Sequence, residues 1–267
     1  MLGRSRRCPH IMGILNVTPD SFSDGGRFFS LEAAEGEALN LERQGASIID
    51  IGGESTRPGA QAVSAEEERE RVIPLINALK KKLSIPLSID TTKATVAARA
   101  LERGASILND ISGLTEDPEM PAVVKHYKPT VVLMHRKGNS STMKGLSSTL
   151  DEIREDLKHK AQNALSFGLS KEQIILDPGL GFGKTVADNW NILKNLNVFQ
   201  SLGFPLLIGA SRKSFLGDLV GGEPHERDAA TLAVTALCFE KNIEYVRVHN
   251  VFMTHRFLSV LEKTKGY

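Results

Sequence analysis

The sequence predicts a single-domain α/β protein, a (β/α)8 or TIM barrel that spans residues 1–267. Eight short apolar, β-branched runs alternate with longer amphipathic stretches, and the length is close to the roughly 250 residues that one such barrel needs. Repeated β-then-α units give parallel strands with right-handed crossovers. Because periodicity cannot show closure, an open doubly wound sheet is the alternative fold.

The expected strands are brief apolar segments that end at polar or turn-forming residues. They cover residues 10–17, 47–51, 86–89, 107–110, 130–134, 174–177, 205–209 and 245–248. Apolar side chains at helical spacing predict the helices that follow them. These cover residues 31–44, 65–83, 93–103, 118–126, 150–167, 186–202, 227–241 and 251–263.

The composition excludes several classes of protein. Hydrophobic residues make up 41% of the chain, charged residues 24%, and the net charge is +1. This balance is typical of globular proteins, and it favours neither nucleic acid nor a membrane as a partner. Cys8 and Cys238 fit no metal-ligand spacing and no disulfide scaffold.

The N-terminal segment carries arginines before a short apolar run at residues 11–15, which loosely imitates a signal peptide. The run is too short, and Asn16, Pro19 and Asp20 end it without a cleavage site of small residues. No segment approaches the roughly 20 apolar residues of a membrane span. We therefore expect a cytoplasmic protein.

Nearly every expected strand ends in a residue able to do chemistry. In a barrel these ends meet at one face, where the active site forms. The end residues are Asn16, Gly52 with Gly53 and Glu54, Asp90, Asn109 with Asp110, His135, Asp177, Ser211 with Arg212 and Lys213, and Arg247 with His249. Such residues on all eight strands predict a site at this face.

Two of the connecting loops have compositions that suggest a function. Residues 16–26 are rich in turn formers and glycine but place Phe22 at their centre, which favours a lid over a plain surface connector. Residues 52–59 combine glycines with the hydroxyl of Thr56 and the guanidinium of Arg57, as a phosphate cradle would. With Arg247 and His249 this predicts a polyanion site, although a structural role for His249 is equally open.

Asp90 and Asp177 each follow an apolar strand residue and should point into the barrel. A buried carboxylate is costly unless it is paired, so both could pair with Lys213 or Arg247 for structural reasons. Alternatively they hold a ligand rich in N–H donors, with Asn109 facing a mixed donor and acceptor edge. A pterin has such an edge, and its carbonyl oxygen and N5 would accept from Lys213.

Seven segments together resemble the dihydropteroate synthase family, in family order across almost the whole chain. They are residues 12–26 (MGILNVTPDSFSDGG), 50–59 (DIGGESTRPG), 88–91 (SIDT), 109–113 (NDISG), 177–184 (DPGLGFGK), 209–214 (GASRKS) and 247–250 (RVHN). The resemblance implies a (β/α)8 barrel and a transferase of folate biosynthesis. Its substrates would be 6-hydroxymethyl-7,8-dihydropterin pyrophosphate and p-aminobenzoate, and its products 7,8-dihydropteroate and pyrophosphate.

The resemblance also implies roles for individual residues. The pterin would contact Asp90, Asn109, Asp177 and Lys213; the pyrophosphate would contact Asn16, Arg57, Arg247 and His249; and the p-aminobenzoate pocket, where sulfonamides act in this family, would include Phe22, Thr56, Pro58 and Ser211. Asn16 would bind Mg2+, and the catalytic groups would be Asp90, Lys213, Arg247 and His249. Family members are typically homodimers.

Two segments depart from or lie outside this pattern. The chain begins nine residues before the first expected strand, so we expect the N-terminal hairpin of the family to be short or missing. The polar segment 136–148 carries no matched functional residue, and no role is assigned to it.

The chemistry expected for such a site is displacement at the pterin methylene, with departure of the pyrophosphate leading because the aromatic amine is a weak nucleophile. Three other functions are compatible with parts of the sequence. A pterin-dependent methyltransferase would lack the Ser-Thr-Arg-Pro loop and the pair Arg247 and His249. A Schiff-base aldolase would use Lys213, and a catalytically silent pterin-binding protein would show no turnover.

Overall fold

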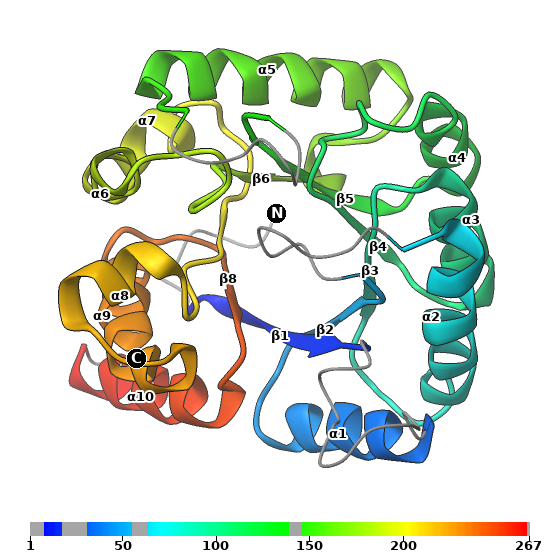
Figure 1. Ribbon diagram of the computed structural model, residues 1–267, viewed down its shortest axis with the longest axis horizontal. Coiled ribbons are helices and arrows are strands. Elements are labelled where there is room, and N and C mark those ends of the chain that lie inside the picture. The colour runs from blue at the N-terminus through cyan, green and yellow to red at the C-terminus, as the bar shows by residue number, and fades with distance from the viewer. Residues whose placement is uncertain (1–7, 18–30, 55–62, 139–145, 266–267) are drawn as a thin grey trace.

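The computed structural model describes residues 8–17, 31–54, 63–138 and 146–265. Eight short strands surround the centre of the molecule, and helices surround the strands (Figure 1). The strands are β1 (His10–Asn16), β2 (Ile48–Gly52), β3 (Leu87–Asp90), β4 (Ile107–Asp110), β5 (Thr130–Met134), β6 (Ile174–Asp177), β7 (Leu207–Ile208) and β8 (Tyr245–Val248). Each is bordered by a helix of the outer ring, as the alternating sequence pattern predicts.

The sheet runs in the order β6-β5-β4-β3-β2-β1-β8-β7, and the paired strands are parallel. Its two ends meet where the backbone N–H of Leu176 donates to the carbonyl of Pro205 at 2.9 Å, next to a parallel bridge between Leu176 and Leu206. This contact closes the ring. The (β/α)8 barrel is confirmed, and the open doubly wound sheet is excluded.

Several helices begin at residues whose side chains satisfy a free backbone N–H group of the first turn. The side chains of Ser64, Thr149 and Thr185 each accept from the backbone three residues later. The helices are α1 (Leu31–Arg43), α2 (Ala65–Leu79), α3 (Ala94–Arg103), α4 (Met120–Tyr127), α5 (Leu150–Ser166), α6 (Val186–Lys194), α7 (Leu196–Gln200), α8 (Ser214–Val220), α9 (Asp228–Glu240) and α10 (Val251–Thr264), with short 3-10 turns at Lys171–Gln173 and Pro224–Arg227. Within the described ranges, none of them has both the length and the apolar content that a membrane crossing requires.

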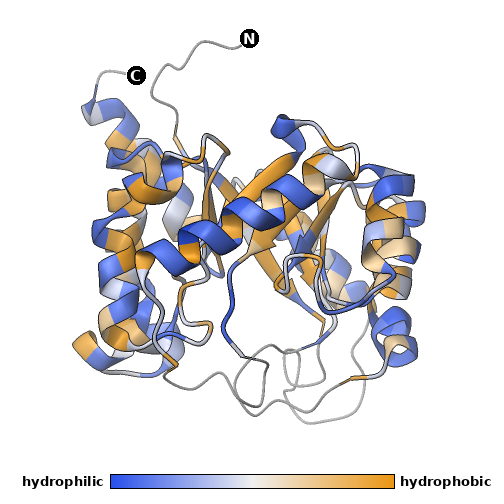
Figure 2. Cartoon of the chain, turned by 90° about the horizontal axis from the view of Figure 1, so that it is seen from above, coloured by the Kyte–Doolittle hydropathy of each residue, from blue (hydrophilic) through white to orange (hydrophobic). Residues whose placement is uncertain are grey.

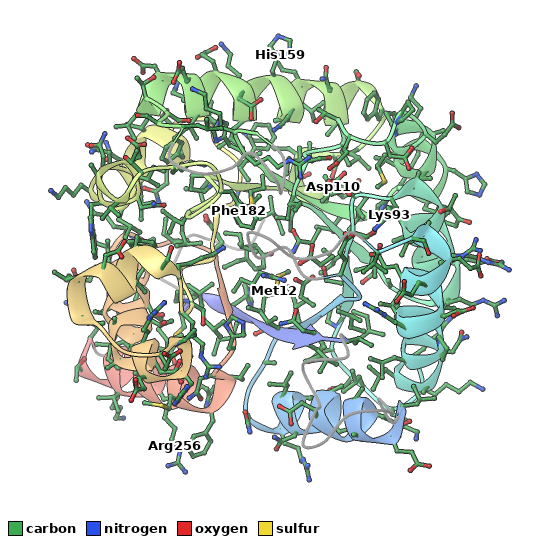
Figure 3. The ribbon with its side chains drawn as sticks, in the orientation of Figure 1. Met12, Lys93, Asp110, His159, Phe182 and Arg256 are labelled. Carbon is green, nitrogen blue, oxygen red and sulfur yellow. The ribbon has the colours of Figure 1, made fainter. Side chains whose placement is uncertain are left out.

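Apolar side chains fill two separate regions. The larger lies between the strands and the helices, whose hydrophobic residues face inward while hydrophilic ones face outward (Figure 2). The smaller lies inside the barrel near Met12, which Figure 3 places within the ring of strands. It consists of Met12, Ile48, Ile107, Val132, Ile175 and Leu207. This packed layer closes the barrel interior, so a ligand is confined to its mouth.

The helix expected at 65–83 ends earlier, at Leu79, and three further elements differ from the sequence prediction. The helix expected at residues 186–202 is broken into α6 and α7 at Asn195, whose side chain donates to the carbonyl of Asn191 in place of a continuous helix. The strand expected at 205–209 is reduced to Leu207–Ile208, with Leu206 in an isolated bridge to Leu176, and Pro205 at the start of the expected range has no N–H to donate. Helix α8 was not predicted, because it is only 7 residues long.

Candidate active site

The register of the sheet brings the end residues of four strands into one row. Asn16 pairs with Gly52, Gly52 with Asp90, and Asp90 with Asn109. Each lies at or next to the carboxyl end of its strand, where barrel enzymes bind their substrates. The polar strand ends predicted from the sequence are therefore neighbours in space.

A buried ion-pair network connects this row to β8. The Arg247 guanidinium donates from Nε to Oδ2 of Asp50 at 2.6 Å and from its NH2 nitrogen to Oδ2 of Asp90 at 2.7 Å. Asn109 Nδ2 donates to the same oxygen of Asp50 at 3.0 Å. Of the two pairings that the sequence left open for Asp90, the structure contains the one with Arg247.

Two carboxylates in this network share one guanidinium. Burial and the neighbouring charge of Asp50 raise the pKa of Asp90 to about 7, although Arg247 opposes the shift. The second oxygen of Asp50, Oδ1, is buried and has no hydrogen-bond partner among the described residues. A buried acceptor without a partner is costly, so this side of the network suits a ligand that donates hydrogen bonds.

Sequence reasoning did not single out Asp50. Its side chain is fully buried, at 0% exposure. The available signal was a lone charge inside the apolar strand Ile48–Gly52, since a charged residue is rarely fully buried unless it is paired. Its partners could not be read from the sequence, because Arg247 lies 197 residues further along the chain.

Asp177 and Lys213 face the mouth from the adjacent strands β6 and β7. Oδ1 of Asp177 accepts from the backbone N–H of Gly179 at 2.7 Å, and burial raises the pKa of this carboxyl. Burial, reinforced by the charge of Arg247, lowers the pKa of Lys213 to about 8. The Lys213 ammonium lies 4.0 Å from the ring centroid of Phe182, which sequence reasoning also did not single out.

Ser211 and His249 follow the neighbouring strands β7 and β8, and their side chains are in contact. The Ser211 hydroxyl lies 2.9 Å from Nδ1 of His249 and accepts from the His249 backbone N–H at 3.2 Å. The two residues were assigned to different parts of the site, the p-aminobenzoate pocket and the pyrophosphate site. Their contact makes these two parts adjacent.

Four of the predicted site residues, Phe22, Thr56, Arg57 and Pro58, lie outside the described residues. Their assignments stay predictions. Among the residues that are described, no group of three or more His, Cys, Asp or Glu side chains forms a metal cluster.

Asn16, the predicted Mg2+ ligand, ends β1 beside Gly52. A Cβ at Gly52 would lie 3.7 Å from the Asn16 amide oxygen, so this oxygen lies directly beside the glycine. Mg2+ is usually held by one or two protein oxygens together with water and substrate phosphates, so a single amide oxygen fits this ion. Magnesium binding stays a prediction.

Comparison with known proteins places the whole barrel in one group. The family model described as pterin binding enzyme matches residues 12–249. Over 246 residues the chain is 49% identical to the dihydropteroate synthase of Synechocystis. The matched region covers 91% of this chain and 85% of that relative. The chain belongs to the dihydropteroate synthase family. It is accordingly an enzyme, a transferase, as the sequence motifs predicted.

Solved structures of this family share the fold closely. The dihydropteroate synthase of Clostridium difficile, solved in the presence of pteroic acid, superposes with a TM-score of 0.90 at 42% identity and covers 98% of this chain and 99% of its own. The Xanthomonas albilineans synthase with 4-aminobenzoic acid also has a TM-score of 0.90, at 41% identity, covering 97% of this chain and 94% of its own. The closed barrel is therefore the family fold.

Proposed function

We propose that the chain condenses 6-hydroxymethyl-7,8-dihydropterin pyrophosphate with p-aminobenzoate, giving 7,8-dihydropteroate and pyrophosphate in folate biosynthesis. The observation that carries this proposal is the set of three carboxylates and one ammonium at the barrel mouth: Asp50 and Asp177, which are buried, and Asp90 with Lys213. The family relatives solved with pteroic acid and with 4-aminobenzoic acid support both substrates.

The pterin would bind through its polar edge. Its 2-amino group and N3–H donate to Asp177, and its carbonyl oxygen and N5 accept from Lys213. Asp90 and Asn109 contact the ring from the adjacent strands, and Asp50 holds Asn109 in place. Because both kinds of hydrogen bond involve a charged protein group, each contributes more than a neutral pair would.

The reaction would begin with departure of the pyrophosphate. The C–O bond to the pterin methylene breaks, the oxygen keeps the electron pair, and Arg247, His249 and Arg57 stabilise the negative charge. Asp90 and Asp177 stabilise the cation that spreads into the pterin ring. The p-aminobenzoate nitrogen then forms the new C–N bond and gives up a proton to solvent water. Asn16 would hold Mg2+, which would supply further positive charge to the leaving group.

Pyrophosphate release tests the proposal directly. With both substrates we expect equal amounts of pyrophosphate and 7,8-dihydropteroate; without p-aminobenzoate we expect slow release, because departure does not wait for the amine. Strict dependence on p-aminobenzoate would refute the order of events, and absence of dihydropteroate would refute the reaction. A Schiff-base aldolase would instead leave an aldehyde adduct on Lys213 after borohydride reduction.

Pterin binding should depend on pH in both directions. Asp90 loses its charge as the pH falls through about 7, and Lys213 loses its charge as the pH rises through about 8. Affinity should therefore be greatest between these values and fall about tenfold per pH unit outside them. Calorimetric titration of 6-hydroxymethyl-7,8-dihydropterin across this range measures it. Lys213→Arg should remove the alkaline fall, whereas constant affinity in the wild type would contradict the assignment.

Three expectations from the sequence stay predictions. They are the assignment of residues 1–267 to one domain, the cytoplasmic location and the homodimer.

For the homodimer, α8 ends in an apolar pair, Leu219 and Val220, which are 70% and 57% exposed. Exposed apolar residues of this size suit burial against a second protein surface.

A further inference from the structure

The turn after β6, residues 178–184, packs directly on the backbone of the segment that follows β5. Its glycines Gly179 and Gly183 have φ values of +71° and +68°. A Cβ at Gly179 would lie 1.9 Å from the carbonyl oxygen of His135, and one at Gly183 would lie 2.1 Å from that of Lys137. The two backbones are therefore in contact without side chains between them.

Lys184 ends this turn and holds the contact together. Its ammonium donates to three backbone carbonyls: Gly179 at 2.8 Å, Phe182 at 3.1 Å and His135 at 3.2 Å. The three carbonyls use the three N–H donors of the ammonium, so none is left for a substrate. Lys184 thus acts on the site only through the backbone groups that it binds.

Keeping this ammonium in the interior is costly. The residue is 7% exposed, and burial lowers the pKa of Lys184 to about 7. Among the described carboxylates, none lies within ion-pair distance of its nitrogen. An aliphatic side chain here would avoid the desolvation cost. The stabilisation that offsets this cost must therefore come from the three carbonyls that the ammonium holds in place.

Two of the backbone groups bound by Lys184 lie on residues that contact the predicted pterin ligands Asp177 and Lys213. Gly179, held through its carbonyl, donates its N–H to Oδ1 of Asp177 at 2.7 Å. Phe182, held in the same way, places its ring 4.0 Å from the Lys213 ammonium. Figure 3 shows Phe182 inside the ring of helices.

We propose that Lys184 is a positioning residue for the pterin half of the site. It fixes Asp177 through Gly179 and Lys213 through Phe182, without touching the substrate. This inference rests on the proposed function. The p-aminobenzoate pocket was assigned to residues on other loops and to Ser211, so loss of Lys184 should affect one substrate and not the other.

The test is Lys184→Met, which keeps an unbranched side chain as far as Cε and removes the ammonium donors. The Kd of 6-hydroxymethyl-7,8-dihydropterin and the KM of its pyrophosphate should both rise by about tenfold or more, the loss expected for one or more hydrogen bonds to a charged group. The KM of p-aminobenzoate should stay within about twofold of the wild type. Lys158→Met is the matched control, because Lys158 lies exposed on α5, and it should change nothing.

The outcomes are distinguishable. An unchanged pterin Kd in folded Lys184→Met, or an equal rise in both KM values, would overturn the positioning role. If the Met variant does not fold, Lys184→Gln keeps an amide donor and should give the same split between substrates; failure of both variants to fold would show a general structural role instead. A wild-type enzyme without pterin binding or pyrophosphate release would refute the proposed function itself, whatever Lys184 does.

Discussion

Arg247→Gln should lower both activity and stability more than any other single change at the site. It leaves Asp50 and Asp90 buried without their common cation. Removing one partner of a buried ion pair costs about 3–5 kcal/mol, and we expect about 3 kcal/mol because the Arg247 side chain is itself 22% exposed. Turnover should fall by about 10²–10³-fold, the usual loss when one group that stabilises developing negative charge is removed.

Urea unfolding and steady-state turnover measure the two effects. The double variant Asp50→Asn/Arg247→Gln should recover part of the stability, because the amide needs no cation, but none of the activity. Arg256→Gln is the control, since Arg256 lies on the outer face of the helical ring (Figure 3). A stable Arg247→Gln enzyme would contradict the ion-pair argument.

Lys213→Ala should remove most of the activity and leave the protein folded. A hydrogen bond to a charged group contributes about 1.5–3 kcal/mol, so pterin affinity should fall roughly 10- to 150-fold. Stability should change little, because the burial that lowers the pKa of Lys213 already opposes its charge in the free enzyme. Calorimetry with 6-hydroxymethyl-7,8-dihydropterin measures the loss of affinity, and a thermal melt measures any change in stability. Wild-type turnover in this variant would show that Lys213 is not a pterin ligand.

Much of the fold could be predicted because local pattern and tertiary structure agree. The strands at 107–110, 130–134, 174–177 and 245–248 begin and end where the apolar runs do. The prediction was wrong where a single side chain interrupts a helix, as at Asn195. It was also wrong where pairing with a neighbouring strand sets the length of a strand, as in β7. Such decisions depend on distant partners and leave no periodic signal.

The candidate site could be predicted in part for a related reason. The rule that barrel sites form at strand ends gave Asp90, Asn109, Asp177 and Lys213, and the structure brings these residues to one mouth. It could not give residues that act through others. Asp50 lies within its strand, and the Lys184 ammonium donates to three backbone carbonyls. Both residues lie in segments that resemble the family, 50–59 and 177–184, but their contacts follow from strand register and close packing, which the motifs do not state.

The closure between β6 and β7 has a consequence for the coupling of folding and binding. β7 is two residues long, and one parallel bridge joins Leu176 to Leu206 there, so local opening of the ring breaks fewest backbone hydrogen bonds at this seam. Asp177 ends the strand on one side of the seam, and Lys213 follows the strand on the other. A pterin that contacts both is a non-covalent cross-link across the weakest join of the barrel. By linkage, its binding free energy is added to the cost of opening the seam. Amide hydrogen exchange in β6 and β7 should therefore slow as the site fills, while exchange in the densely paired strands β1 and β2 stays the same.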